Sequence, residues 1–259
     1  MRYLRLVAIF WSASTAARME YRAAFVVALL AAFVETGGKL FGVYLFYSSG
    51  YDLGGWRWQE ALLVLGFAQL LDAFFLLIFQ PNLRRISEMV QEGTLDFVLL
   101  KPVDSQFWVS VQKLDPIGLP YLLLGLAVLA YGGLASGITG AGWVWLAAAG
   151  AGAVFLAYAL AFLLATTSIW FVKIFNVVFF LSSMIWSAQY PVQAYTRPFR
   201  LFMTFVLPLY FMTTAPAELA LGRADGAAPL AVFLVAAGLF GVSRAFWRFA
   251  LRYYTSASS

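Results

Sequence analysis

PNLRRISEMVQEGTLDFVLLKPVDSQFWVSVQKLD, residues 81–115, is a polar segment inside a chain that otherwise carries few charges. Nine of its 35 residues are charged, whereas charged residues make up 11% of the whole chain. The apolar runs on both sides reach about 20 residues, which as helices would cross a hydrocarbon core of ~30 Å. A polar stretch of this length is too long for a tight turn. We expect it to form a small folded structure at one surface of a membrane.

The composition predicts an all-α, polytopic integral membrane protein with a single transmembrane domain over residues 1–259. Hydrophobic residues make up 63% of the chain and the mean hydropathy is +0.84. In lipid each backbone N–H and C=O needs an internal partner, so the long apolar runs have to be helices. Cysteine and histidine are both absent. Their absence excludes disulfides, thiolate chemistry and the commonest metal ligands and general bases.

Six spans are predicted, at about residues 23–46, 58–80, 116–135, 143–166, 172–190 and 228–247. The positive-inside rule orients them with both termini in the cytoplasm. In that orientation the cytoplasmic side carries 12 cations, namely Arg2, Arg5, Arg18, Arg22, Arg84, Arg85, Lys101, Lys113, Lys173, Arg244, Arg248 and Arg252, and the outer side carries four, namely Arg57, Arg197, Arg200 and Arg223.

Two further segments have more than one interpretation. Residues 201–215 are apolar and could be a seventh span, but Pro208 interrupts them. We expect residues 191–227 to form an outer re-entrant helical hairpin, broken at Pro208 and closed near Pro216 and Gly222. Residues 1–22 are expected to be an amphipathic interfacial helix, with a cleaved signal peptide or irregular chain as the alternatives. As a helix this segment places Leu4, Val7 and Trp11 on one face and Arg2, Arg5, Ser12 and Glu20 on the other.

Within the polar segment, Asn82 is expected to cap a short helix that begins near Leu83, and Gly93 is expected to end it in the left-handed conformation. Ile86, Met89 and Val90 follow at helical spacing and form an apolar ridge. Charged side chains surround that ridge: Arg84, Arg85, Glu88 and Glu92. Such a helix, about 15 Å long, would fit a groove on a soluble partner. The alternative is a loop helix packed on its own protein or on lipid headgroups.

The residues Ile86-Ser87-Glu88, Gly93-Thr94-Leu95-Asp96-Phe97, Leu100 and Pro102 resemble the membrane subunits of type-2 ABC exporters, in the six-span branch formerly of unknown function. The resemblance implies a permease with a cytoplasmic coupling helix, located in the bacterial inner membrane. It also implies a second permease copy or a similar permease, and separate ABC ATPase subunits that hold ATP and Mg²⁺. The chain itself has no G-x-x-x-x-G-K-[ST] sequence and is expected to bind no cofactor directly. The implied ATPase contacts are Arg84, Arg85, Ile86, Glu88, Met89, Val90, Glu92, Gly93, Leu95 and Asp96.

Three ionisable residues fall inside predicted spans: Glu35, Lys39 and Asp72. A lone charge at the bilayer centre costs at least ~2.5–3.5 kcal/mol, so such residues face protein or water. Glu35 and Lys39 are four residues apart and can pair on one helix face. The cluster could fix how spans pack, line a substrate path or relay protons. Rival functions are a proton-coupled secondary transporter, for which no internal repeat is found, and a membrane-embedded enzyme, for which no catalytic spacing is found. A purely structural membrane subunit is the third alternative.

Overall fold

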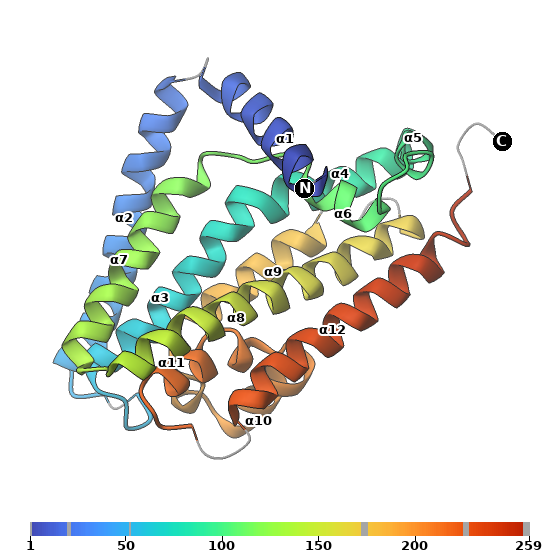
Figure 1. Ribbon diagram of the computed structural model, residues 1–259. Helices are drawn as coiled ribbons and strands as arrows, with labels where there is room; N and C mark the ends of the chain where they lie inside the picture. The colour runs from blue at the N-terminus through green and yellow to red at the C-terminus, as the bar shows by residue number, and fades with distance from the viewer. Residues whose placement is uncertain (1, 20–21, 52, 172–175, 225–227, 256–259) are drawn as a thin grey trace.

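The computed structural model describes residues 2–19, 22–51, 53–171, 176–224 and 228–255, and within these ranges the regular structure is entirely helical. Figure 1 shows the helices as one bundle with shorter helices at both ends. The α-helices are α1 (Arg2–Met19), α2 (Arg22–Ser48), α3 (Trp58–Phe74), α4 (Gln80–Gln91), α5 (Leu95–Leu99), α6 (Ser105–Val111), α7 (Gly118–Ser136), α8 (Gly140–Thr166), α9 (Asn176–Ser187), α10 (Arg197–Leu201), α11 (Thr214–Ala220) and α12 (Ala228–Ala250).

Five stretches of helix are long and apolar enough to cross a membrane: Ala23–Ser48, Trp58–Gln91, Gly118–Ser136, Gly140–Ile169 and Pro229–Ala250. They confirm the prediction of an all-α polytopic membrane protein. The predicted span at 172–190 contains α9, of which 12 residues are described, and residues 172–175 lie outside the described part. The number of six crossings therefore stays a prediction.

The central helix of the bundle is α3, which is buried along nearly its whole length. It packs against α7, α2, α8 and α9, while α12 packs against α8. Helices α2 and α12 lie at opposite edges of the bundle (Figure 1). Large apolar side chains on these edge helices are exposed, for example Val34 and Leu234. Such surfaces suit contact with lipid tails, because no water has to be ordered around them there.

The helix that contains α3 is longer than a bilayer requires. It continues through a π-helical turn at Phe75–Phe79 into α4. The 34 residues from Trp58 to Gln91 give a length of about 51 Å, against a hydrocarbon core of ~30 Å. The prediction that a separate helix begins near Leu83 with Asn82 as its cap is wrong, because the chain is already helical there. The first part of the polar segment is a rigid continuation of the central span.

The two ends of the bundle differ in structure (Figure 1). One end carries α1, α4, α5 and α6 and the end of α12. The other end carries the α2–α3 and α7–α8 connections and the described part of the hairpin, residues 191–224. The hairpin consists of short pieces, and the backbone is extended at Leu207, immediately before Pro208. No continuous helix covers residues 201–215, so the expected break at Pro208 is confirmed. Pro216, however, lies in α11 and does not close the hairpin; Gly222, with φ +66°, follows its end.

The N-terminal helix α1 lies against the polar segment. Tyr3 packs edge-on against Phe107 and Phe10 packs edge-on against Trp108, with ring centroids 4.7 and 5.0 Å apart. Leu4, on the face that was expected to be apolar, is exposed. The prediction of a helix is confirmed over Arg2–Met19, and its place in the headgroup layer stays a prediction.

Candidate functional site: the polar segment and its attachment

The polar segment folds back onto its own bundle through its apolar side chains. Gly93 has φ +69° and follows the end of α4, as predicted. Ile86, Met89 and Leu95 are 0–6% exposed and belong to the same core as side chains of α8 and α12. The expected ridge of Ile86, Met89 and Val90 therefore points mainly inward. The burial of Ile86, Met89 and Leu95 favours the alternative of a helix packed on its own protein at these three positions. Their role in ATPase docking stays a prediction.

The other residues assigned to ATPase docking remain at the surface. Arg84 and Glu92 are exposed, and Arg85, Glu88, Val90, Gly93 and Asp96 are partly exposed. The Tyr254 hydroxyl, beyond the end of α12, lies near Asp96, and burial together with this carboxylate raises the pKa of Tyr254. The docking role of these residues stays a prediction.

An exposed apolar tip was missing from the sequence-based list of contacts. Phe97 is 68% exposed and Leu100 is 80% exposed, at and just after α5, whereas Val98 between them is buried. Phe97 and Leu100 belong to the residues that carry the family resemblance, and in the sequence they form part of the apolar run Phe-Val-Leu-Leu between Asp96 and Lys101. We call Phe97, Leu99 and Leu100 the apolar tip. It lies at the bundle end that carries α4 and α6.

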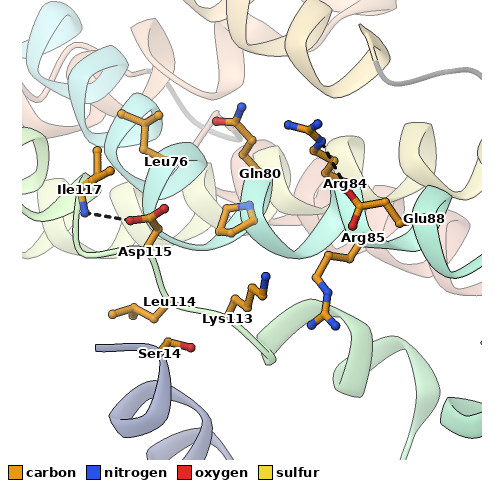
Figure 2. A pocket seen from close by; sticks show the side chains of 11 residues that line it. Ser14, Leu76, Gln80, Arg84, Arg85, Glu88, Lys113, Leu114, Asp115 and Ile117 are labelled. Atoms are coloured by element: carbon orange, nitrogen blue, oxygen red, sulfur yellow. Dashed lines mark hydrogen bonds and ion pairs between the residues drawn. The ribbon is translucent and has the colours of Figure 1, made fainter. Parts of the chain in front are cut away.

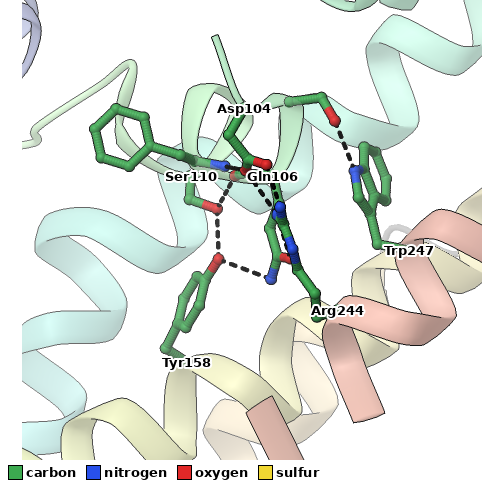
Figure 3. A network of polar contacts seen from close by, with 8 residues as sticks. Asp104, Gln106, Ser110, Tyr158, Arg244 and Trp247 are labelled. Atoms are coloured by element: carbon green, nitrogen blue, oxygen red, sulfur yellow. Dashed lines mark hydrogen bonds and ion pairs between the residues drawn. The ribbon is translucent and has the colours of Figure 1, made fainter. Parts of the chain in front are cut away.

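A polar network joins α6 to α8 and α12 (Figure 3). The Asp104 carboxylate caps α6 by accepting from the Phe107 N–H at 2.9 Å. The same carboxylate forms a bidentate ion pair with Arg244 of α12, in which Nη1 donates to Oδ1 at 2.7 Å and Nη2 donates to Oδ2. The hydrogen bonds from Arg244 hold the pKa of Asp104 below its usual range. The cap of α6 is therefore also the attachment of α6 to α12.

Two further side-chain pairs belong to this network. The Ser110 and Tyr158 hydroxyls lie 2.8 Å apart, which connects α6 to α8. Trp247 donates from Nε1 to the Ser105 hydroxyl at 3.0 Å, which adds a second link to α12. Hydrogen bonds of this kind resist separation more in a dry, low-dielectric interface than in water. The polar segment, α8 and α12 should therefore move as one body at this end.

A second attachment fixes the end of the polar segment to the central helix. The Asn82 amide clamps the Lys113 main chain, donating to its C=O at 2.7 Å and accepting from its N–H at 2.8 Å. One turn earlier, the Leu77 C=O within the π-helical turn accepts from the Asp115 N–H at 2.9 Å. Gly118 permits this approach, because a Cβ there would meet the Leu77 nitrogen at 2.7 Å. Asn82, predicted to be a helix cap, therefore serves as a clamp.

The intramembrane ionisable residues form one cluster between α2 and α3. The Lys39 ammonium lies 2.8 Å from Glu35 and 2.8 Å from Asp72, and it donates to Gln69 at 3.1 Å. The predicted pairing of Glu35 with Lys39 is confirmed, and Asp72 is an additional partner. Lys39 also lies over the Trp186 ring, 5.6 Å from its centroid. This geometry fits the interpretation of a contact that fixes how α2 and α3 pack. The Lys39 ammonium neutralises one of the two carboxylates, Glu35 on α2 and Asp72 on α3.

The opposite end has its own buried ion cluster, which the sequence analysis did not find. Glu60 of α3 is fully buried and pairs with Arg57 at 2.6 Å and with Arg223 at 2.7 Å. Arg223 also lies over the Trp56 ring, 5.5 Å from its centroid. Since Arg223 follows α11, this cluster attaches the end of the hairpin to the central helix.

These features define a class: a multi-pass α-helical membrane subunit whose polar segment is built onto one end of its spans as a folded platform. The chain belongs to the family described as "ABC-2 family transporter protein", whose sequence model matches residues 33–258. It is therefore a permease subunit of an ABC transporter, a family that works with ABC ATPase subunits. No curated protein matches the chain significantly.

Proposed function

We propose that this chain forms the membrane path of an ATP-driven exporter, and that a separate ATPase subunit drives it through the polar segment. ATP and Mg²⁺ bind to that partner, since the chain has no phosphate-binding loop sequence. Two permeases, either two copies or this chain and a similar one, enclose the path. The membrane is the bacterial inner membrane, and both termini face the cytoplasm.

The clustering of cations supports this orientation. Arg84, Arg85 and Lys101 lie in the polar segment and Arg248 lies near the end of α12, all assigned to the cytoplasm by the positive-inside rule. The smaller outer set includes Arg57 and Arg223, which share the Glu60 cluster at the other end of the bundle.

The single observation that carries the proposal is the apolar tip. Two large side chains, Phe97 and Leu100, are more than two-thirds exposed, whereas Leu95, Val98 and Val109 of the same segment are buried. Charged residues flank them, including Glu92, Asp96 and Lys101. Apolar anchors within a polar rim are the usual pattern of a protein interface. At a polar membrane surface such a tip suits the groove of a soluble ATPase.

The attachments give this surface a mechanical connection to the spans. A push on α4 acts directly on α3, because the two are parts of one helix. A push on α6 reaches α12 through Arg244 and α8 through Tyr158. A closing motion of an ATPase pair can therefore reach three spans without passing through a flexible loop.

Affinity purification from native membranes tests the proposal. We expect the wild-type chain to bring down an ATPase with a phosphate-binding loop and to show nucleotide hydrolysis. Phe97→Glu and Leu100→Glu should each reduce recovery of that ATPase at least tenfold, while Tyr51→Glu, an equally exposed aromatic change at the other end, should not. Transport by the purified chain without any ATPase would contradict the proposal and favour a secondary transporter.

Asp96→Arg is a second test of the same surface. Asp96 is only partly exposed, so the charge reversal should leave the chain inserted in the membrane. We expect nucleotide-dependent transport by the complex to be lost. Normal transport by this variant would show that Asp96 does not belong to the contact surface. The apolar tip would still be tested by the Phe97 and Leu100 variants.

A further inference from the structure

A cavity of about 680 Å³ lies beside α4 at the platform end of the bundle. Its walls come from α1, from the π-helical turn and α4, and from the chain that links α6 to α7 (Figure 2). Ser14 lies on the α1 side, and Arg85 and Lys113 lie across from it. Three residues expected to contact the ATPase, Arg84, Arg85 and Glu88, also line this space. The apolar tip does not line it, so the surface that carries the proposed function lies elsewhere on the segment.

The cavity is lined by three cations, Arg84, Arg85 and Lys113, and by two carboxylates, Glu88 and Asp115, so cations are in excess by one. The Asp115 carboxylate accepts from the Ile117 N–H at 3.2 Å. Arg84 has an acidic partner, Glu88, at 3.5 Å. Arg85 instead donates to the neutral Gln112 at 2.8 Å. In the part of the chain that the structure describes, neither Arg85 nor Lys113 forms an ion pair. These two cations, from α4 and from the chain that follows α6, therefore remain available to an anion. A guanidinium beside an ammonium is a common way to bind phosphate.

The same cavity also has apolar walls. Leu76, Leu114 and Ile117 line it on the side of the π-helical turn. Free phosphate would leave these side chains against water, whereas an amphiphile would cover them. The volume lies within the usual range of about 300–1,000 Å³ for small-molecule sites, which leaves room for a headgroup and the first part of the acyl chains.

We propose that this cavity binds an anionic phospholipid from the adjacent membrane surface. The lipid phosphate lies between Arg85 and Lys113, and its chains run along Leu76 and Ile117. Basic pockets between helices at a membrane surface recognise such headgroups. The lipid would fill the space between α1 and the platform and so hold the N-terminal helix against α4. The proposal concerns the isolated chain and does not depend on the ATPase.

The test uses the purified, delipidated full chain in neutral detergent. Thermal stability and native mass spectra are recorded with phosphatidylglycerol, with phosphatidylcholine and with inorganic phosphate. We expect phosphatidylglycerol alone to stabilise the chain and to remain bound. If inorganic phosphate stabilises the chain as much as phosphatidylglycerol does, the cavity binds a free anion. If the two lipids have equal effects, the cavity does not recognise the headgroup. Either result overturns the proposal.

Three variants locate the binding. Lys113→Gln should weaken retention of phosphatidylglycerol about tenfold, and Lys113→Arg should restore it. The clamp survives both changes, because Asn82 binds only the Lys113 main chain. Lys101→Gln is the matched control, since Lys101 lies over the Trp108 ring outside the cavity. If Lys113→Gln and Lys101→Gln behave alike, the assignment is wrong.

Two further experiments test the proposal without changing a charge: a variant that fills the cavity and a cross-link from its wall. Ser14→Trp should exclude the lipid while the lipid-free melting temperature stays that of the wild type. Because the chain has no cysteine, Ser14→Cys provides a unique thiol for a photoreactive probe in native membranes. Cross-linking to lipid supports the proposal. Cross-linking to another protein would assign the cavity to a protein partner and overturn it.

Discussion

Arg244 and Asp104, 140 positions apart in the chain, form a bidentate ion pair that joins the last span to the cap of α6. Both side chains are about 30% exposed, so the pair lies at the edge of the bundle. A fork-to-fork arrangement of guanidinium and carboxylate has one favoured geometry. The pair therefore fixes the orientation of α6 relative to α12 as well as their distance.

A double-mutant cycle should detect this pair. Asp104→Asn keeps a good helix cap but removes the charge, and Arg244→Gln removes the fork. We expect the two single changes and the double change to give a coupling energy of about 1 kcal/mol, the upper end for partly exposed pairs. The melting temperatures of the four proteins in nanodiscs provide the measurement. Strict additivity of the single effects would show that the two residues do not act together.

The contribution of Asp104 should depend on pH in a defined direction. Its folded-state pKa is lowered, chiefly by the hydrogen bonds from Arg244. A lowered pKa adds stability above the unfolded value of about 3.9, and this stability is lost as the pH falls through the folded value. The stability difference between the wild type and Asp104→Asn should thus be constant from pH 8 to 5 and shrink below about pH 4. A difference that already disappears at pH 6 would contradict this account.

Lys39→Met should be more damaging than either carboxylate change. Without Lys39, the 9%-exposed Asp72 side chain loses its cation in a low-dielectric site, a loss that costs about 3–5 kcal/mol. We expect low recovery of folded protein after extraction, and partial rescue by the added change Asp72→Asn. Glu35→Gln serves as the mild comparison, since Glu35 is 32% exposed. If the double variant gives no more folded protein than Lys39→Met, the unpaired Asp72 charge is not the cause of the damage, and the cluster does more than hold α2 and α3 together.

Asn82→Ala should release the end of the polar segment from the central helix. The Lys113 N–H and C=O would lose their partner, at a cost of about 1–3 kcal/mol. Hydrogen exchange should quicken at the Lys113 and Asp115 amides, because the Asp115 bond to Leu77 depends on the same close approach. Gln91→Ala, at the exposed end of α4, is the control and should leave exchange at these amides unchanged.

Features governed by short-range geometry were predictable from the sequence. The Glu35–Lys39 pair follows from a four-residue spacing on one helix. The end of α4 at Gly93 and the break at Pro208 follow from backbone rules for glycine and proline. The class of protein follows from composition, because long apolar runs in lipid have only helical solutions.

The orientation of α4 was not predictable in the same way. The spacing of Ile86 and Met89 indicated that one face avoids water, but a partner groove and the protein's own core satisfy that pattern equally well. The structure buries both side chains against α8 and α12 and exposes Phe97 and Leu100 instead. The structure thus favours the apolar tip, rather than the ridge of α4, as the apolar part of the candidate docking surface.

The sequence by itself determined that this chain is a helical membrane protein with one long polar segment between its apolar runs. Only the tertiary structure decided how the segment is held: Asn82 on Lys113, Asp104 on Arg244, and Asp72 on Lys39. Each of these pairs joins residues more than 30 positions apart. Their contact depends on the rotation and tilt of whole helices, which are set by packing over the entire bundle and leave no periodic signal near either partner.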